Sequence, residues 1–151
     1  LRDSYIHRDS VGLIAFRKES AEVLLPFTRS VERAERLLAT LPTGGKTPLA
    51  QGLRTAYTMC DRLLRKHSAE RIQIICITDG RATSGDSEEP VAEAKQWARI
   101  LGTLPVDCIV IDTETGFIKL GLAKKLCQLM NGSYYAMDTI TADRILRVSR
   151  R

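Results

Sequence analysis

The feature that most constrains this chain is the regular alternation of short apolar runs with longer amphipathic segments. Short runs rich in β-forming residues predict strands, at residues 10–16, 22–26, 71–78, 106–112 and 133–136. Apolar residues spaced three and four apart predict helices, at residues 31–38, 48–67, 90–101, 120–130 and 141–150. Strands separated by helices imply βαβ units with right-handed crossovers. We therefore expect an α/β fold with an open, doubly wound, mostly parallel sheet and helices on both faces.

Local signals refine the ends of these elements. Ser30 directly precedes an amphipathic segment and is predicted to be its N-cap. Pro26 lacks a backbone N–H, so its strand either lies at a sheet edge or ends at the proline. Asn131 and Gly132 are predicted to close the helix before the last strand.

Length and composition suit one globular domain. The 151 residues are 44% hydrophobic and 27% charged, which is enough to bury a core without a disulfide or a metal. The cysteines form no C-x-x-C pair and are predicted to be reduced core thiols, at Cys60, Cys76, Cys108 and Cys127. No run approaches the roughly 20 apolar residues of a membrane span. We expect a soluble, cytoplasmic protein.

Several common activities are disfavoured by the sequence. The net charge is +5, but basic and acidic residues are mixed along the chain and aromatics are only 5%, which argues against nucleic-acid binding. Residues 44–47 lack the Walker A spacing, and neither G-x-G-x-x-G nor G-x-S-x-G occurs. His7 and His67 lie in charged segments and are predicted at the surface. Cys76 and Cys108 lie in the middle of strands, where a nucleophile is not expected.

The candidate functional residues that remain carry side-chain oxygens, which are suitable ligands for a metal ion. Thr47 stands at a helix start and Asp79 at the carboxyl end of the strongest strand, and both side chains suit Mg²⁺. Each also has a plain structural interpretation, since Thr47 could be an N-cap and Asp79 could belong to a simple turn with Gly80. Asp112 and Glu114 suggest either a second acidic site or an ordinary strand end. Lys46 and Arg81 are interpreted as solvated loop charges.

Two motifs together carry a family resemblance. Gly44–Leu49 (GGKTPL) precedes a helix and Ile77–Arg81 (ITDGR) follows a strand, and both resemble metal-site loops of von Willebrand factor A (integrin I-like) domains. Val11–Phe16, Glu22–Pro26 and Ile111–Glu114 are similar to the carboxy-terminal domain of magnesium chelatase D subunits. The resemblance runs over essentially the whole chain and implies one domain, residues 1–151, of this fold.

The resemblance also implies a metal site. In that family a D-x-S-x-S motif after the first strand, a threonine in the second loop and an aspartate in the third hold the ion, and the last two roles fall on Thr47 and Asp79. The D-x-S-x-S motif has no counterpart here, and residues 1–9 resemble only the end of the helix that follows it. That first strand is central to the family's sheet. We therefore expect an N-terminally truncated domain in which Mg²⁺ binding is weak or absent.

The implied function is protein–protein interaction within an ATP-dependent magnesium chelatase. The resemblance implies a module that bridges an AAA+ ATPase subunit and a porphyrin-binding subunit, for insertion of Mg²⁺ into protoporphyrin IX during chlorophyll and bacteriochlorophyll synthesis. A partner's acidic residue would complete the metal site. The module itself would not be catalytic, although the assembly is a ligase that forms nitrogen–metal bonds.

Two alternatives stay open at this point. One is a generic metal-dependent adhesion or scaffold domain of the same fold, serving another AAA+ ATPase or a cobalt chelatase. The other is a small Mg²⁺-dependent phosphatase with Asp79 as nucleophile. The presence of Arg81, where a second carboxylate would be expected, counts against the phosphatase.

Overall fold

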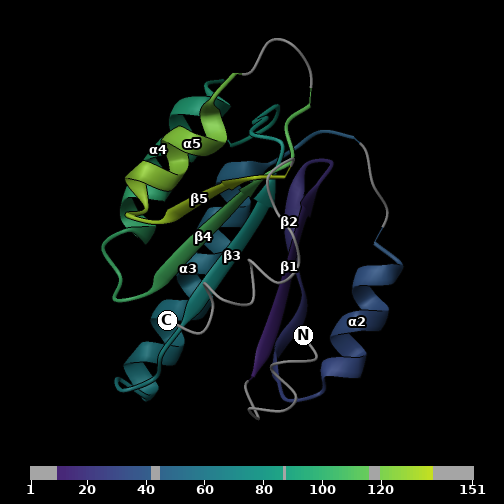
Figure 1. Ribbon diagram of the computed structural model, residues 1–151, viewed down its shortest axis with the longest axis vertical. Coiled ribbons are helices and arrows are strands. Elements are labelled where there is room, and N and C mark those ends of the chain that lie inside the picture. The colour runs from purple at the N-terminus through teal and green to yellow at the C-terminus, as the bar shows by residue number, and fades with distance from the viewer. Residues whose placement is uncertain (1–9, 42–44, 87, 116–119, 138–151) are drawn as a thin grey trace.

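Two groups of strands share a layer of helices in the computed structural model of this protein, which describes residues 10–41, 45–86, 88–115 and 120–137 (Figure 1). In chain order the described elements are β1 (Val11–Arg17), β2 (Ser20–Thr28), α2 (Val31–Ala39), α3 (Leu49–Lys66), β3 (Gln73–Thr78), α4 (Pro90–Leu101), β4 (Asp107–Asp112), α5 (Leu122–Leu129) and β5 (Ser133–Ala136). These elements confirm the predicted strands and helices within the described ranges. The predicted helix at 141–150, the helix end at 1–9 and Gly44 lie outside them.

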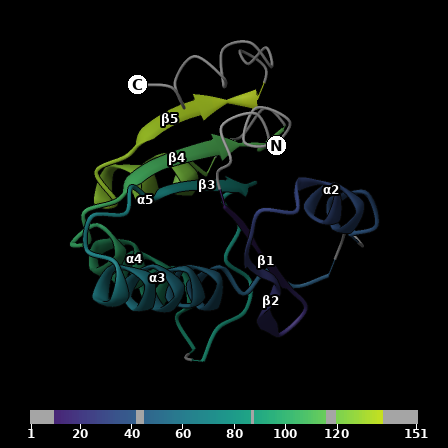
Figure 2. The ribbon, with the colours of Figure 1, turned by 90° about the horizontal axis from the view of Figure 1, so that it is seen from below.

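The larger sheet is parallel, as the alternation of strands and helices predicts. Its order is β3-β4-β5, with Ile75 opposite Ile109 and Val110 opposite Tyr134. Three helices, α3, α4 and α5, cover one face of the sheet (Figure 2). The core between them is made of small and branched apolar side chains, including Leu53, Ala98, Val110 and Leu126.

The smaller sheet is the antiparallel part of an arrangement that the sequence predicts to be mostly parallel. Strands β1 and β2 pair antiparallel, because only Lys18 and Glu19 separate them and so short a link can only make a hairpin. Lys18 has a φ of 61°, which gives the turn its left-handed residue. Strand β2 does not end at Pro26 but continues to Thr28. It lies at a sheet edge, which was one of the two positions predicted for a strand that contains this proline.

Helix α3 joins the hairpin to the rest of the fold. A Cβ atom at Gly52 would lie 2.7 Å from the Phe16 ring, so the glycine allows α3 and β1 to approach closely. Helix α2 packs against the opposite side of the hairpin, where Leu37, Ala15 and Leu24 line a shared hollow. Helices thus pack on both sides of the hairpin, although β1 is only half-buried and most of β2 is exposed.

The strands do not form one continuous sheet among the described residues. Hydrogen-bonded order runs β1-β2 in one sheet and β3-β4-β5 in the other, with no pairing between β1 and β3.

The predicted cysteine chemistry is borne out. All four are free thiols: Cys60, Cys108 and Cys127 are buried, and Cys76 is half-buried against the core. Burial raises the pKa of Cys76 to about 12 and those of Cys60 and Cys108 to about 11. Such thiols stay protonated at neutral pH, which suits core residues and not nucleophiles.

The structure also bears on the predicted N-cap at Ser30 and on the expectation that no segment spans a membrane. Ser30 occupies the N-cap position of α2, as predicted, although its side chain makes no capping hydrogen bond. Its backbone N–H donates instead to the Thr28 hydroxyl at 3.2 Å. No helix within the described ranges is long and apolar enough to span a bilayer.

Candidate functional site

The carboxyl ends of three strands meet at one edge of the molecule. The Ser84 hydroxyl, in the loop after β3, donates to the Lys18 carbonyl oxygen at the end of β1, at 3.0 Å. The Thr113 N–H, after β4, donates to the Thr78 carbonyl oxygen at 2.9 Å. In open α/β sheets ligands bind at this edge, so the loops that follow these strands form the first candidate site.

Thr47 is held at this edge by the loop that follows β3. Its N–H donates to the Thr83 hydroxyl at 2.7 Å, and the Thr83 N–H donates back to the Thr47 carbonyl oxygen at 3.2 Å. Helix α3 begins at Leu49 with Pro48 in the N-cap position, so the alternative interpretation of Thr47 as the N-cap is wrong. The Thr47 hydroxyl makes no hydrogen bond to another described residue, which leaves this oxygen available to a ligand.

Asp79 leaves the sheet directly after β3. One carboxylate oxygen accepts the Arg81 N–H at 3.0 Å, and the other lies 3.7 Å from the Arg81 guanidinium Nε. Gly80 makes the turn with a φ of +71°, and a Cβ there would lie 3.0 Å from the Ala123 backbone nitrogen. The simple-turn interpretation is therefore satisfied. With 42% of the Asp79 side chain exposed, its carboxylate can still meet a ligand.

Thr47 and Asp79 each present an oxygen of the kind that Mg²⁺ prefers as a ligand. A free hydroxyl and a half-exposed carboxylate are hard oxygen ligands at the same edge, which fits the ion's chemistry. No hydrogen bond joins Thr47 to Asp79, and the described ranges contain no cluster of three acidic, histidine or cysteine side chains able to hold a metal. Further ligands would have to come from outside these residues.

Asp112 and Glu114 order the loop after β4. The buried Asp112 carboxylate accepts the Tyr134 hydroxyl at 2.6 Å and the Glu114 N–H at 2.8 Å. One Glu114 carboxylate oxygen accepts the Leu120 N–H at 2.8 Å, and the other is buried without a hydrogen-bond partner. These contacts favour the strand-end interpretation over a second acidic site. Tyr134 was not identified from the sequence, because a tyrosine in a short strand gives no sign of its partner.

The sequence also missed the polar loop that supports the edge. In this loop Thr83 bonds to the backbone of Thr47. Asp86 accepts hydrogen bonds from Gln51 at 2.8 Å and Arg54 at 3.3 Å, both on α3. The only available signal was the run of small polar residues after Gly80. This loop ties the end of β3 to the start of α3.

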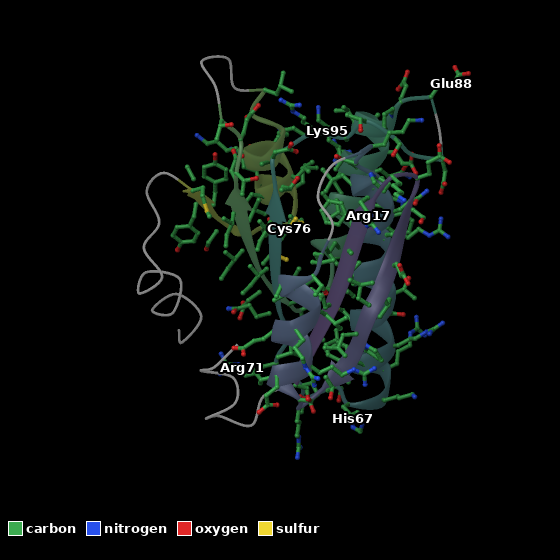
Figure 3. The ribbon with its side chains drawn as sticks, turned by 90° about the vertical axis from the view of Figure 1, so that its right-hand side faces the viewer. Arg17, His67, Arg71, Cys76, Glu88 and Lys95 are labelled. Carbon is green, nitrogen blue, oxygen red and sulfur yellow. The ribbon has the colours of Figure 1, made fainter. Side chains whose placement is uncertain are left out.

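The surrounding charges are exposed. Lys46 pairs with Glu19 at 3.5 Å across the loop and the hairpin turn, and such solvated pairs contribute little, as predicted for a loop charge. Figure 3 shows Glu88 and Lys95 toward one end of the molecule, with His67 and Arg71 at the other. His67 is exposed at the end of α3, as predicted, whereas His7 lies outside the described residues.

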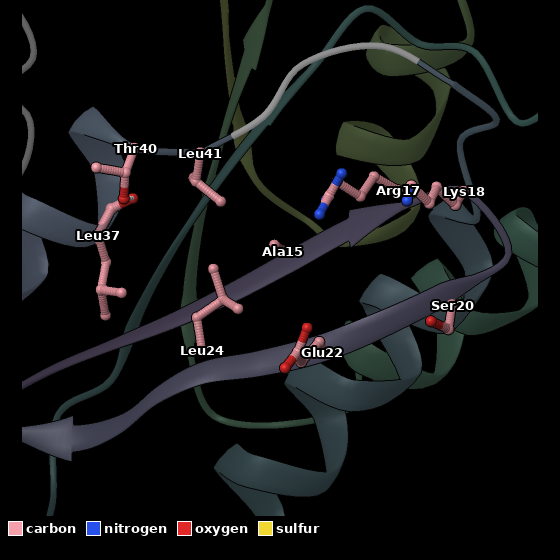
Figure 4. Close-up of a pocket in the computed structure, with 9 residues that line it drawn as sticks. All are labelled: Ala15, Arg17, Lys18, Ser20, Glu22, Leu24, Leu37, Thr40 and Leu41. Carbon is pink, nitrogen blue, oxygen red and sulfur yellow. Dashed lines mark hydrogen bonds between the residues drawn. The ribbon is translucent and has the colours of Figure 1, made fainter.

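A shallow hollow of about 300 Å³ lies between the hairpin and the end of α2 (Figure 4). Its lining mixes apolar and polar side chains, from Ala15, Arg17, Lys18, Ser20, Glu22, Leu24, Leu37, Thr40 and Leu41. Neither Thr47 nor Asp79 contributes to it. The hollow is therefore a separate surface feature from the edge site.

Comparison with known proteins agrees with this architecture. The sequence profile of the von Willebrand factor type A domain matches residues 2–81. The chain is 38% identical to the uncharacterized protein MJ0910 of Methanocaldococcus jannaschii, over 99% of this chain and 87% of that protein. It is 36% identical to the magnesium-chelatase 67 kDa subunit of Chlorobaculum tepidum, over 99% of this chain but only 26% of that subunit.

A solved structure supports the fold independently. The conserved hypothetical protein BatB from Bacteroides thetaiotaomicron superposes with a TM-score of 0.69, covering 95% of this chain and 77% of that one. The sequence identity is 17%, so this likeness concerns the fold alone.

Proposed function

Since this chain belongs to the von Willebrand factor type A family, we propose that it is the protein–protein interaction module of a D-type magnesium chelatase subunit. The observation that carries the proposal is its similarity to the 67 kDa subunit, at 36% identity over 99% of this chain. The chain spans about a quarter of that subunit, so the activity of the whole assembly is part of the proposal.

In this proposal the module bridges an AAA+ ATPase subunit and a porphyrin-binding subunit, in the cytoplasm, for insertion of Mg²⁺ into protoporphyrin IX. It performs no chemistry of its own. The edge that carries Thr47 and Asp79 is the docking face. Hydrogen bonds within and between its loops hold their backbones in place, and the Asp79 side chain remains exposed to solvent. An ordered, exposed loop cluster on a rigid sheet is well suited to recognition.

Thr47 and Asp79 would hold a bound Mg²⁺ in the docking face. When bound, the ion supplies positive charge that attracts a partner's carboxylate, and that carboxylate can serve as a further ligand. The chain's own contribution is positioning: Thr83 fixes the backbone of Thr47, and the tight turn at Gly80 fixes Asp79. In the resemblance the remaining ligands belong to a D-x-S-x-S motif, which this chain lacks.

Capture of the partner subunits tests the proposal. The complete subunit that contains this domain is immobilised, and binding of the ATPase and porphyrin-binding subunits is measured with Mg²⁺ and with a chelator. Asp79→Asn is expected to abolish Mg²⁺-dependent capture. Asp107→Asn is the matched control. Asp107 is also an exposed carboxylate, but it stands at the start of β4, at the end of the sheet away from Asp79. Equal capture by the two variants would contradict the role of Asp79.

A second candidate is a scaffold domain of the same family that serves another AAA+ ATPase or a cobalt chelatase. It is favoured by MJ0910, of which this chain covers 87%, so that a closely similar domain also occurs in a short protein. Chelation assays with Mg²⁺ and Co²⁺ on the reconstituted subunits separate the two. The phosphatase alternative gains no support, since Arg81 interacts with both carboxylate oxygens of Asp79.

A further inference from the structure

The Asp79 carboxylate already has a positively charged neighbour in this structure. One of its oxygens accepts the Arg81 N–H at 3.0 Å, and the other lies 3.7 Å from the guanidinium Nε of the same residue. Both oxygens therefore interact with one cationic residue. A divalent cation bound to this carboxylate would compete with that guanidinium for the same negative charge.

The backbone keeps Arg81 beside this carboxylate. The hydrogen bond from the Arg81 N–H closes a short turn over Asp79, so the base of the arginine side chain stays next to the carboxylate in every rotamer. Gly80 leaves this turn little room to shift, because a Cβ there would lie 3.0 Å from the Ala123 backbone nitrogen. The carboxylate and the guanidinium are therefore held as neighbours.

Two other cationic side chains close to these loops pair with acids that are not candidate ligands. Lys46 lies 3.5 Å from Glu19, and Arg54 lies 3.3 Å from Asp86. Arg81 differs from them, because its counter-ion in the described part of the chain is the candidate ligand itself. Its positive charge is therefore the one most directly opposed to a bound metal ion.

We propose that Arg81 is an internal counter-ion, which competes with a divalent cation for Asp79 and so sets how tightly the docking face binds the ion. The inference rests on the proposed function, because it concerns the regulation of the same edge. Without a bound ion, the guanidinium neutralises the carboxylate. Arg81 is not a ligand, since a guanidinium has hydrogen-bond donors and no lone pair for a metal.

The competition is moderate in strength and depends on salt. The side chains are 62% exposed at Arg81 and 42% exposed at Asp79, so water and dissolved ions screen their charges. The repulsion between a divalent ion and the guanidinium is about twice that between two single charges at the same distance. Arg81 therefore tunes the affinity of the site and does not block it.

Manganese binding tests the competition, in the complete subunit that contains this domain and without nucleotide. Mn²⁺ shares the preference of Mg²⁺ for carboxylate and water ligands, and electron paramagnetic resonance measures the free ion. Binding at this site is defined as the part that Asp79→Asn removes. Arg81→Gln keeps the backbone N–H but removes the charge, and it is expected to tighten this binding about 3-fold to 10-fold at low ionic strength.

Three comparisons separate the charge of Arg81 from other effects. In about 0.5 M salt the gain in Arg81→Gln should fall below about 2-fold, because the repulsion is screened. Arg81→Lys keeps the charge and should stay within about 2-fold of the wild type. Arg54→Gln is the matched control, since Arg54 is similarly exposed but pairs with Asp86, and it too should stay within about 2-fold.

Each result decides the role of Arg81. Binding by Arg81→Gln that is equal to or weaker than that of the wild type overturns the inference, as does equal tightening in Arg81→Lys or Arg54→Gln. Should no variant show binding that depends on Asp79, the metal site in the proposed function fails and the inference fails with it. Tighter binding by Arg81→Gln without capture of partner subunits would support the inference while contradicting the proposed function.

Discussion

Thr47 and Thr83 hold each other by a reciprocal pair of hydrogen bonds, although 36 residues separate them. The Thr47 N–H reaches the Thr83 hydroxyl at 2.7 Å, and the Thr83 N–H reaches the Thr47 carbonyl oxygen at 3.2 Å. The pair fixes the start of α3 against the end of β3. It is the contact on which the geometry of the candidate site depends most directly.

Removal of the Thr83 hydroxyl should loosen this connection. Thr83→Val keeps the shape of the side chain but leaves the Thr47 N–H without its acceptor, at an expected cost of about 0.5–1.5 kcal/mol in the free energy of unfolding. Urea denaturation measures the change. Thr58→Val is the control, because the exposed Thr58 hydroxyl bonds only within its own helix, and its effect should stay within about 0.5 kcal/mol. A Thr83 variant as stable as this control would contradict the role of the pair.

The turn after β3 should reject a side chain. Gly80→Ala meets both a left-handed φ of +71° and a backbone nitrogen 3.0 Å from the new Cβ. Gly121→Ala is closely matched, with a φ of +71° but no atom within 4 Å of its Cβ. The control should lose about 1–2 kcal/mol from backbone strain alone, and Gly80→Ala should lose more. Thermal unfolding of the two variants checks the order, and the reverse order would exclude the contact with Ala123.

The buried Asp112 carboxylate should depend on Tyr134. Tyr134→Phe removes a hydroxyl that donates at 2.6 Å and leaves a buried oxygen without that donor, at an expected cost of about 1–3 kcal/mol. Tyr135→Phe, one residue along the same strand, is expected to change stability by less than about 0.5 kcal/mol. Denaturant midpoints give both values. Similar losses in the two variants would mean that the hydroxyl of Tyr134 is not the important group.

Alkaline pH should weaken the fold through its buried thiols. Burial raises the pKa of Cys76 from an ordinary value of 9.0 to about 12. Below pH 9 both folded and unfolded chains keep the proton, so this contribution is complete. Between pH 9 and 12 only the unfolded chain releases it, and stability should fall by up to about 1.4 kcal/mol per pH unit for each such thiol.

Cys76→Ala isolates this contribution. Its unfolding free energy should decline less steeply above pH 9 than that of the wild type, whereas the two slopes should agree below pH 8. Urea titrations at a series of pH values provide the comparison. Parallel slopes above pH 9 would show that Cys76 is not protonated selectively in the folded state.

The strands and helices were largely predictable because burial imposes a period on the sequence. The run at 71–78 and the spacing in α3 left little freedom of interpretation. The antiparallel hairpin was not predicted, since the apolar runs alone carry no strand direction. The short link at Lys18 and Glu19 was the signal that distinguished it.

The candidate site was predictable only in part. Asp79 follows from the position of a carboxylate after a strong strand, and Thr47 from the loop before a helix. Their supporting contacts could not be predicted, because Thr83 and Tyr134 meet their partners only when distant segments approach in the folded chain. The N-cap interpretation of Thr47 failed since the helix starts two residues later, with Pro48 preceding its first residue.

Pro26 makes the two edges of the hairpin differ in their capacity to pair with a further strand. Strand β2 forms the outer border of its sheet, and an exposed residue without an N–H interrupts the row of donors there. Strand β1 carries no proline, so the side of β1 that no other described strand pairs with keeps its full row of backbone donors. The β2 edge of the hairpin is thus protected against edge-to-edge pairing with other molecules, while the β1 edge can still pair with a neighbouring strand.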